Sequence, residues 1–142
     1  MNEPKETIAV DANPLFSALR GGRAKSVLYS DKLSFLTTEY TTWEVKKYIP
    51  EISVDTGVPE SELFDAFDHF PITSMPPDAY DEVRQHAENL IARRDPKDVD
   101  ILALALKLDI PIWTNDHDFG NLPEIKTLTT AEILAKIAAL AD

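Results

Sequence analysis

The sequence contains no cysteine, which excludes zinc–thiolate sites, cysteine nucleophiles and redox-active dithiols and leaves the fold to be held by packing alone. It also has no run approaching the roughly 18 apolar residues of a membrane span. The opening residues, MNEPKE, lack the apolar region of a signal peptide. We therefore expect a soluble cytoplasmic protein. Its 142 residues suffice for a buried core and predict a single domain over residues 1–142.

Basic residues are scarce beside acidic ones. The chain has 14 Lys and Arg against 25 Asp and Glu, a formal net charge of −11 and a pI near 4.6. Such a surface as a whole repels nucleic acid. A nucleic-acid substrate would therefore need a local positive charge, supplied by cations bound between carboxylates or by basic residues around the site. Without such a site, the charge equally fits an acidic protein that never meets nucleic acid.

Short apolar runs alternate with helical patterns, and this alternation predicts an α/β fold on a mainly parallel sheet. Strands are expected at 7–10, 33–38, 72–75, 110–114 and 125–128. Helices are expected from Pro14 to the Gly21-Gly22 pair, at 24–29, from Thr41 through Ile49, over most of 50–95 including 79–93, at 96–108 and at 130–140.

Three of the expected helix starts carry recognisable caps. Asn13 precedes Pro14 and Asp95 precedes Pro96, and proline is tolerated in a first helical turn because its missing N–H would be unpaired there. Residues 129–132 (TTAE) have the spacing of a capping box.

Acidic residues follow several of the expected strands. Asp11 comes directly after the first strand, Glu44 comes after the second, and Asp116 follows 112–114, while Asp98 opens the apolar helix. The carboxyl ends of parallel strands lie along one edge of a sheet, so these acids can converge there. Converging carboxylates repel one another unless a cation lies between them, and Mg²⁺ or Mn²⁺ prefers such oxygen ligands. Two such ions about 3.5–4 Å apart can activate water and stabilise a leaving oxygen, which indicates phosphodiester hydrolysis.

Each acid also has a structural explanation. Glu44 stands three residues after Thr41, and Asp98 three residues after Asp95, so both fit capping boxes as well as a metal site. Asp11 is harder to explain in this way, because an acid directly after a buried strand is costly without a partner and no local partner is evident.

The chain resembles the PIN-domain nucleases, especially the ribonuclease toxins of the VapBC toxin–antitoxin type (VapC-type toxins). The resemblance lies in 8–13 (IAVDAN), in Glu44, and above all in 98–105 (DVDILALA) leading to 113–119 (WTNDHDF). It covers about half of the chain and leaves 50–95 unassigned. Asn115 stands where many relatives carry arginine.

The resemblance implies a three-layer α/β/α sandwich around a short, mainly parallel sheet. It also implies Mg²⁺- or Mn²⁺-dependent endoribonuclease activity on RNA, inhibition by an antitoxin protein, and a homodimer. By position, the metal-binding and catalytic acids are Asp11, Glu44, Asp98 and Asp116, with Asn13 and Thr114 orienting the first and fourth acids. Asp100 is the reserve ligand, since it points about 160–200° away from Asp98 on a helix, and Asp118 is an outer ligand or a turn residue.

Other polar and aromatic residues are weaker candidates. Lys46, Lys47, Arg93, Arg94 and Lys97 lie near the second and third acids in the sequence and are RNA-binding candidates, although such residues commonly form a solvated face. Trp43 either stacks on a base or packs beneath its helix. The histidines, His69, His86 and His117, have no ligand spacing and are expected to be solvated.

Two rival functions are considered. One is a catalytically silent PIN-like module that binds RNA or protein. The other is a phosphotransfer receiver or haloacid-type phosphatase, which also begins with an acid at a strand end. The second is disfavoured, because residues 10–13 lack the paired acids that those sites need. The sequence leaves open which RNA is cleaved and whether an antitoxin exists.

Overall fold

The computed structural model describes residues 5–91, 95–119 and 122–141 and contains a five-stranded sheet. The strands are β1 (Glu6–Val10), β2 (Leu33–Thr38), β3 (Ile72–Met75), β4 (Ile112–Trp113) and β5 (Thr127–Leu128). Every pairing is parallel, and the strand order is β3-β2-β1-β4-β5. The predicted strands are all present, although β4 and β5 are shorter than expected.

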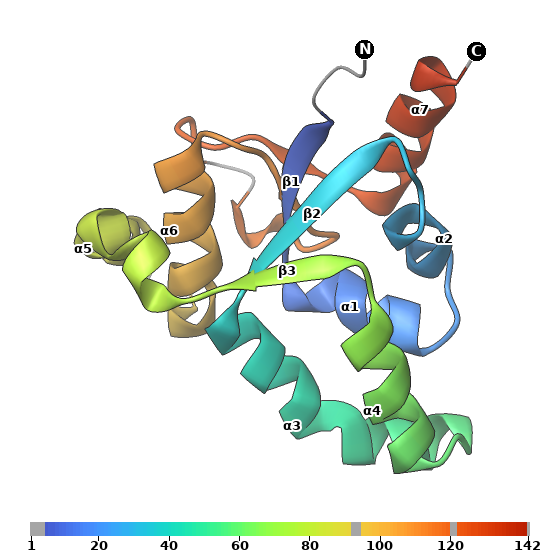
Figure 1. Cartoon of the computed structure of the whole chain (residues 1–142). Helices are drawn as coiled ribbons and strands as arrows, with labels where there is room; N and C mark the ends of the chain where they lie inside the picture. Colours follow the sequence, from blue (N-terminus) through green and yellow to red (C-terminus); the bar gives the residue numbers. More distant parts are fainter. Residues whose placement is uncertain (1–4, 92–94, 120–121, 142) are drawn as a thin grey trace.

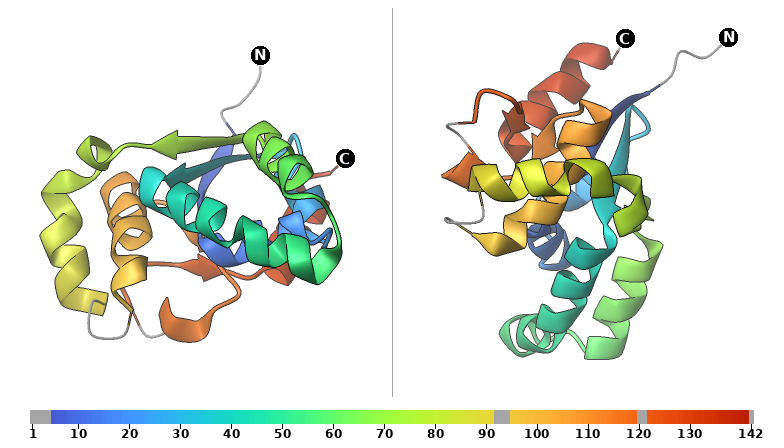
Figure 2. Two further views of the ribbon diagram at one scale, coloured as in Figure 1. Left: turned by 90° about the horizontal axis from the view of Figure 1, so that it is seen from below. Right: turned by 90° about the vertical axis from the view of Figure 1, so that its left-hand side faces the viewer.

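Helices cover both faces of the sheet (Figure 1). The helices are α1 (Ala12–Leu19), α2 (Ala24–Leu28), α3 (Glu39–Thr56), α4 (Glu60–His69), α5 (Asp81–Ile91), α6 (Val99–Leu108) and α7 (Thr130–Leu140). Short 3₁₀ turns are η1 (Pro77–Ala79), η2 (Pro96–Asp98) and η3 (His117–Phe119). Figure 2 shows α5 and α6 on one side of the sheet and α3 and α4 on the other. The three-layer α/β/α fold is therefore confirmed.

The two layers of packing follow from alternation along the strands. Ile8 and Val10 of β1 point into the core formed with α1, α2, α3, α4 and α7, whereas Ala9 points into the core formed with α5 and α6. Both cores are apolar because both faces of a parallel sheet are covered. Trp113 is fully buried in the first core.

Two predicted helix starts are wrong. Helix α1 begins at Ala12 with Asp11 as its N-cap, so Asn13 lies inside the first turn and does not cap it. Helix α3 begins at Glu39, because the side chain of Thr38 accepts the backbone N–H of Thr41 at 2.9 Å. In both places a capping residue stands directly at the strand end, and the chain turns into the helix without the expected spacer.

The other helix boundaries agree with the sequence patterns. Thr129 and Glu132 form a reciprocal capping box at the start of α7, and the Asp95 side chain accepts the Lys97 N–H at 3.0 Å at the start of η2. Helix α3 ends at Gly57, whose φ of 76° is left-handed and favours glycine. In the part of the chain that the structure describes, no helix combines the length and apolarity needed to cross a membrane.

The strand order places a topological switch point beside β1. The chain moves from β1 to β2 and β3 on one side, and then returns to add β4 and β5 on the other. Val10 pairs with Trp113, so β1 and β4 end together at the same edge. In open α/β sheets, ligands bind outside the carboxyl ends of the strands at such a point.

Candidate active site

A cleft of about 220 Å³ opens at the carboxyl ends of β1 and β4. All four acids that the sequence singled out line it, although they come from four different segments of the chain. The lining residues are Asp11, Ala12, Asn13, Phe16, Glu44, Tyr48, Asp95, Lys97, Asp98 and Asp116. The fold therefore brings together Asp11, Glu44, Asp98 and Asp116, as expected from the strand directions.

Asp11 is buried between the end of β1 and the start of α1. Its Oδ1 accepts the backbone N–H of Ala12 at 2.9 Å, and its Oδ2 accepts the hydroxyl of Thr114 at 2.9 Å. The expectation that Asp11 has no local partner is therefore wrong, because the turn into α1 supplies one. Burial, together with the smaller effect of the charges of Asp116 and Asp95, nevertheless raises the pKa of Asp11 to about 6, against the lowering effect of its two hydrogen bonds.

Thr114 connects the first and fourth acids. Its hydroxyl donates to Asp11, and the same oxygen accepts the backbone N–H of Asp116 at 3.1 Å. The Thr114 side chain is almost fully buried, so these two bonds fix its rotamer. Asn13, the other residue assigned to orient the acids, is exposed in the first turn of α1 and lines the cleft.

Glu44 reaches the cleft from the second turn of α3 and is half-buried. Burial raises the pKa of Glu44, and the charge of Asp11 adds to this effect, while Lys97 opposes it. Tyr48 and Glu44 in turn raise the pKa of Lys97. Of the expected RNA-binding cations that the structure describes, Lys46, Lys47 and Lys97, the last lines the cleft.

Asp98 is buried at the junction of η2 and α6. The backbone N–H of Asp98 donates to the carbonyl oxygen of Asp95 at 3.1 Å, so the Asp95-capped turn holds the third acid in place. Asp95 caps this turn and also lines the cleft, and the last residue of the same turn is Asp98.

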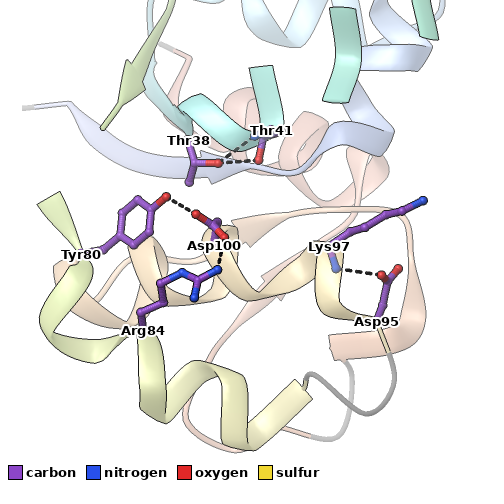
Figure 3. A network of polar contacts seen from close by, with 7 residues as sticks. All are labelled: Thr38, Thr41, Tyr80, Arg84, Asp95, Lys97 and Asp100. Carbon is purple, nitrogen blue, oxygen red and sulfur yellow. Dashed lines mark hydrogen bonds and ion pairs between the residues drawn. The ribbon is translucent and has the colours of Figure 1, made fainter. Parts of the chain in front are cut away.

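Asp100 points away from the cleft and belongs to a separate network. It accepts hydrogen bonds from the Tyr80 hydroxyl and from Nη2 of Arg84, the latter at 3.2 Å. Figure 3 shows Tyr80 and Arg84 converging on Asp100, with Thr38 and Thr41 above them, while the Lys97 side chain extends away from this group. The opposite directions of Asp98 and Asp100 agree with the helical spacing. The sequence motif around Asp100 gave no indication of Tyr80, which lies 20 residues before Asp100 in the chain.

Lys46, Lys47 and Asn115 lie outside the cleft lining. Lys46 pairs with Asp68 at 3.4 Å on the surface, and Lys47 lies over the rings of Trp43 and Tyr48. Asp118 lies in η3 after the last acid. Arg93 and Arg94 lie outside the described residues. Asn115 binds the start of α7, because its Oδ1 accepts the N–H of Thr130 at 2.9 Å and its Nδ2 donates to the Thr130 hydroxyl at 3.1 Å.

The donor chemistry of the cleft fits a hard divalent cation. The five carboxylates that line it, Asp95 included, supply oxygen ligands only, and the raised pKa of Asp11 and of Glu44 reflects, after burial, the repulsion that a cation relieves. Among residues 5–91, 95–119 and 122–141, no three His, Asp or Glu side chains lie close enough to enclose an ion. This arrangement suits Mg²⁺, which keeps several waters and commonly takes only one or two carboxylates from a protein.

Comparison with known families identifies the fold family. The sequence matches the model of the PIN domain over residues 9–138, which includes the middle region that the sequence motifs left unassigned. The chain belongs to the PIN domain family. The PIN domain is a family of nucleases, so the acidic cleft lies in a protein whose relatives hydrolyse phosphodiester bonds. No curated protein matches the sequence of this PIN domain.

Solved structures share the fold at low sequence identity. DNA-bound VapBC from Salmonella typhimurium matches with a TM-score of 0.68 and 13% identity over 89% of this chain and 99% of that one. A toxin–antitoxin complex from Klebsiella pneumoniae matches with a TM-score of 0.63 and 20% identity over 87% of this chain and 97% of that one. PAE2754 from Pyrobaculum aerophilum matches with a TM-score of 0.64 and 20% identity over 95% of this chain and 98% of that one. These likenesses support the architecture of this PIN domain.

Proposed function

We propose that this PIN domain is a Mg²⁺- or Mn²⁺-dependent endoribonuclease whose active site is the acidic cleft. The observation that supports the proposal most directly is the gathering of Asp11, Glu44, Asp98 and Asp116 in one cleft at the switch point of the sheet. Two of the solved PIN-fold structures with the same architecture are VapBC complexes bound to DNA, and a third is a toxin–antitoxin complex.

The four acids would hold the cation, directly or through the waters that it keeps, and the cation would supply an activated water and stabilise the negative charge that develops on the phosphate. The protein's own contribution is to orient and desolvate these groups. Thr114 and the N–H of Ala12 hold the Asp11 carboxylate in one direction. Lys97 lies at the cleft beside Glu44, where its ammonium can bind a phosphate oxygen of the RNA.

Nuclease assays of the purified protein test the proposal. Single-stranded RNA is incubated with Mg²⁺, with Mn²⁺ and with EDTA, and wild type is compared with Asp11→Asn and Asp116→Asn. We expect cleavage by wild type with either metal, and loss of cleavage in EDTA and in both variants. Glu88→Gln, which neutralises an exposed acid on α5, is the matched control and should cleave normally.

A catalytically silent PIN-like module is the alternative. Isothermal titration with Mn²⁺ separates the two, because an active site of this kind binds Mn²⁺ in wild type and loses that binding in Asp11→Asn. Cleavage that survives in Asp11→Asn, once metal-free background has been subtracted, would contradict the proposal. RNA binding without carboxylate-dependent Mn²⁺ binding would favour the silent module.

We further propose that the protein is the toxin of a toxin–antitoxin pair, acts in the cytoplasm as a single-domain homodimer, and is inhibited by a small antitoxin. Dimerisation would bring the few basic residues of two subunits around a shared groove. Light scattering gives the oligomeric state. Co-expression with the product of a small neighbouring gene should relieve growth inhibition, and growth inhibition by wild type but not by Asp11→Asn would link toxicity to the cleft.

A further inference from the structure

Aromatic side chains on α3 form a surface beside the cleft that the proposed cleavage chemistry does not use. We call Tyr40, Trp43, Lys47 and Tyr48 the α3 strip. Trp43 is 56% exposed, so it does not pack beneath its helix. Exposing an indole ring to water forgoes the free energy that burial would give. Trp43 therefore has no core role, and its ring is accessible to a ligand.

The α3 strip is continuous. The Nζ of Lys47 lies 5.2 Å from the centroid of the Trp43 ring and 5.7 Å from that of Tyr48. The rings of Tyr40 and Trp43 are 5.6 Å apart between centroids and tilted by 39°. The contacts of Trp43 with Tyr40 and Lys47 join residues three or four positions apart, which are neighbours on one face of a helix, and Lys47 also reaches the ring of the next residue, Tyr48.

One end of the α3 strip is a wall of the acidic cleft. Tyr48, Glu44 and Lys97 all line the cleft. Tyr40 lies one turn before Glu44 on the same helix face. A strand whose phosphate lies in the cleft can therefore reach the strip.

We propose that the α3 strip binds a nucleobase of single-stranded RNA, with the base stacked on Trp43 and the adjoining phosphate bound by Lys47. The proposal rests on the proposed function, because it assigns the strip to the same substrate. Aromatic rings stack on any base, and cations beside them bind the backbone, so the contact selects single strands without selecting sequence. In a duplex the bases are already stacked, and their faces are not available to Trp43.

The surroundings of Trp43 favour RNA over a protein partner. Lys46 and Lys47 follow it on the same helix, Glu39 precedes it by one turn and is exposed, and Glu44 is its neighbour in the sequence. An interface with a protein typically has an apolar centre from which charged residues are depleted. A single exposed ring among charges, with an ammonium over its face, instead suits a flat, charged ligand such as a nucleotide.

Tryptophan fluorescence gives a direct test, because the chain has two tryptophans and Trp113 is fully buried. The Asp11→Asn protein, which should bind RNA without cutting it, is titrated with a single-stranded RNA oligonucleotide. A strand of the same length without bases, which keeps every phosphate, is titrated in parallel. We expect the RNA to quench the emission of Trp43 and the abasic strand to leave it unchanged.

Variants then measure the contribution of the ring. In the same background, Trp43→Ala should raise the Kd for RNA by about 5- to 150-fold, the range given by base–aromatic stacking, and Trp43→Phe should retain most of the affinity. Val54→Ala removes another exposed apolar side chain from α3, one that is 84% exposed, and should leave the Kd unchanged. Circular dichroism of each variant confirms that it is folded.

Several results would overturn the assignment. Equal quenching by RNA and by the abasic strand would mean that phosphates, and not bases, act on Trp43. An unchanged Kd for RNA in Trp43→Ala would mean that the ring does not bind a base. A loss of dimerisation in that variant would mean that the strip contacts a second protein subunit. The experiments distinguish failure of the base-stacking proposal from failure of the proposed nuclease function. Quenching by RNA in a protein that never cleaves supports the strip alone, whereas normal cleavage with unchanged KM in Trp43→Ala refutes the strip alone.

Discussion

The hydroxyl of Thr114 donates a 2.9 Å hydrogen bond to Oδ2 of Asp11, although 103 residues separate the two in the sequence. The same oxygen accepts the N–H of Asp116 at 3.1 Å. One small side chain at the end of β4 therefore orients the acid at the end of β1 and the backbone that carries the last acid. Parallel pairing of Val10 with Trp113 makes this contact possible, because it brings the two strand ends together.

Replacing Thr114 by valine keeps the shape of the side chain and removes the hydroxyl. We expect Thr114→Val to lower the free energy of unfolding by about 1.5–3 kcal/mol, since a hydrogen bond to a charged group is lost. Cleavage should fall by roughly 10- to 100-fold, the usual effect of removing a residue that orients a metal ligand. Urea unfolding and initial cleavage rates measure the two effects. Thr114→Ser keeps the hydroxyl and should behave like wild type, and a valine variant as stable and active as wild type would contradict this role.

The raised pKa of Asp11 gives the stability a defined pH dependence. Folding raises this pKa from 3.8 to about 6, so the folded state favours the protonated acid. The contribution of Asp11 to the free energy of unfolding is therefore fully present below pH 3.8 and is lost as the pH rises through 6. The shift of about two pKa units corresponds to roughly 3 kcal/mol.

Asp11→Asn should remove that dependence. We expect the variant to be more stable than wild type above about pH 6, and the difference to shrink as the pH falls toward 4. Urea unfolding of both proteins across this range measures the difference, and subtraction cancels the titration of the other acids. A variant that is less stable than wild type at neutral pH would show that the Asp11 carboxylate is not destabilising in the fold.

Divalent cations should offset the destabilisation of the fold that repulsion between the carboxylates of the cleft causes. We expect Mn²⁺ to raise the melting temperature of wild type and EDTA to lower it again, because an ion that binds only the folded state stabilises it by about 2.7 kcal/mol at a concentration of 100 Kd. Asp11→Asn should lose most of this increase. Glu88→Gln, far from the cleft on α5, should keep it, and an equal increase in all three proteins would indicate non-specific binding.

The sequence predicted the site best where an acid directly follows a recognisable strand, because the end of the strand then fixes the position of the acid. Asp11 directly follows a buried run, and parallel strand direction then carries the other acids to the same edge. The helix starts were predicted less well. Asp11 and Thr38 are both good caps that stand at strand ends, but Asn13 and Thr41 are equally good caps within three residues, and only the path of the chain decides between them.

Contacts between distant segments were not predictable. Nothing in the sequence connects Tyr80 to Asp100, since their contact depends on the packing of α5 against α6. The exposure of Trp43 could not be predicted either, because the periodicity of α3 allowed its side chain to face the core or the solvent. The helix begins after Thr38, and this start places the Trp43 side chain in the solvent.

The Asp100 network should affect stability and not metal binding. Tyr80 is fully buried, and its pKa is raised well above its usual range by burial and by its bond to Asp100. We expect Tyr80→Phe and Asp100→Asn each to lower the free energy of unfolding by about 1–3 kcal/mol, because each leaves a buried partner less well satisfied. Both should bind Mn²⁺ with wild-type affinity by calorimetry. Asp98→Asn is the contrasting variant and should lose Mn²⁺ binding, whereas loss in Asp100→Asn would make Asp100 the ligand.

Asn115 should act as an external cap for α7. The N–H of Thr130 lies in the first turn, where helix N–H groups lack partners, and Oδ1 of Asn115 accepts it. The Thr130 hydroxyl accepts from both Nδ2 of Asn115 and Nε1 of Trp113. We therefore expect Asn115→Ala to lower the free energy of unfolding by about 0.5–2 kcal/mol, as for the loss of an N-cap.

Asn115→Asp is the matched control for that cap. It keeps an oxygen for the N–H of Thr130 and adds a negative charge at the start of a helix, where the dipole favours it. We expect it to be closer to wild type than Asn115→Ala in urea unfolding, and both variants to retain Mn²⁺ binding because the Asn115 side chain is bound to α7 and not directed into the cleft. If Asn115→Ala is as stable as wild type but cleaves RNA poorly, the residue acts on the substrate and not on α7.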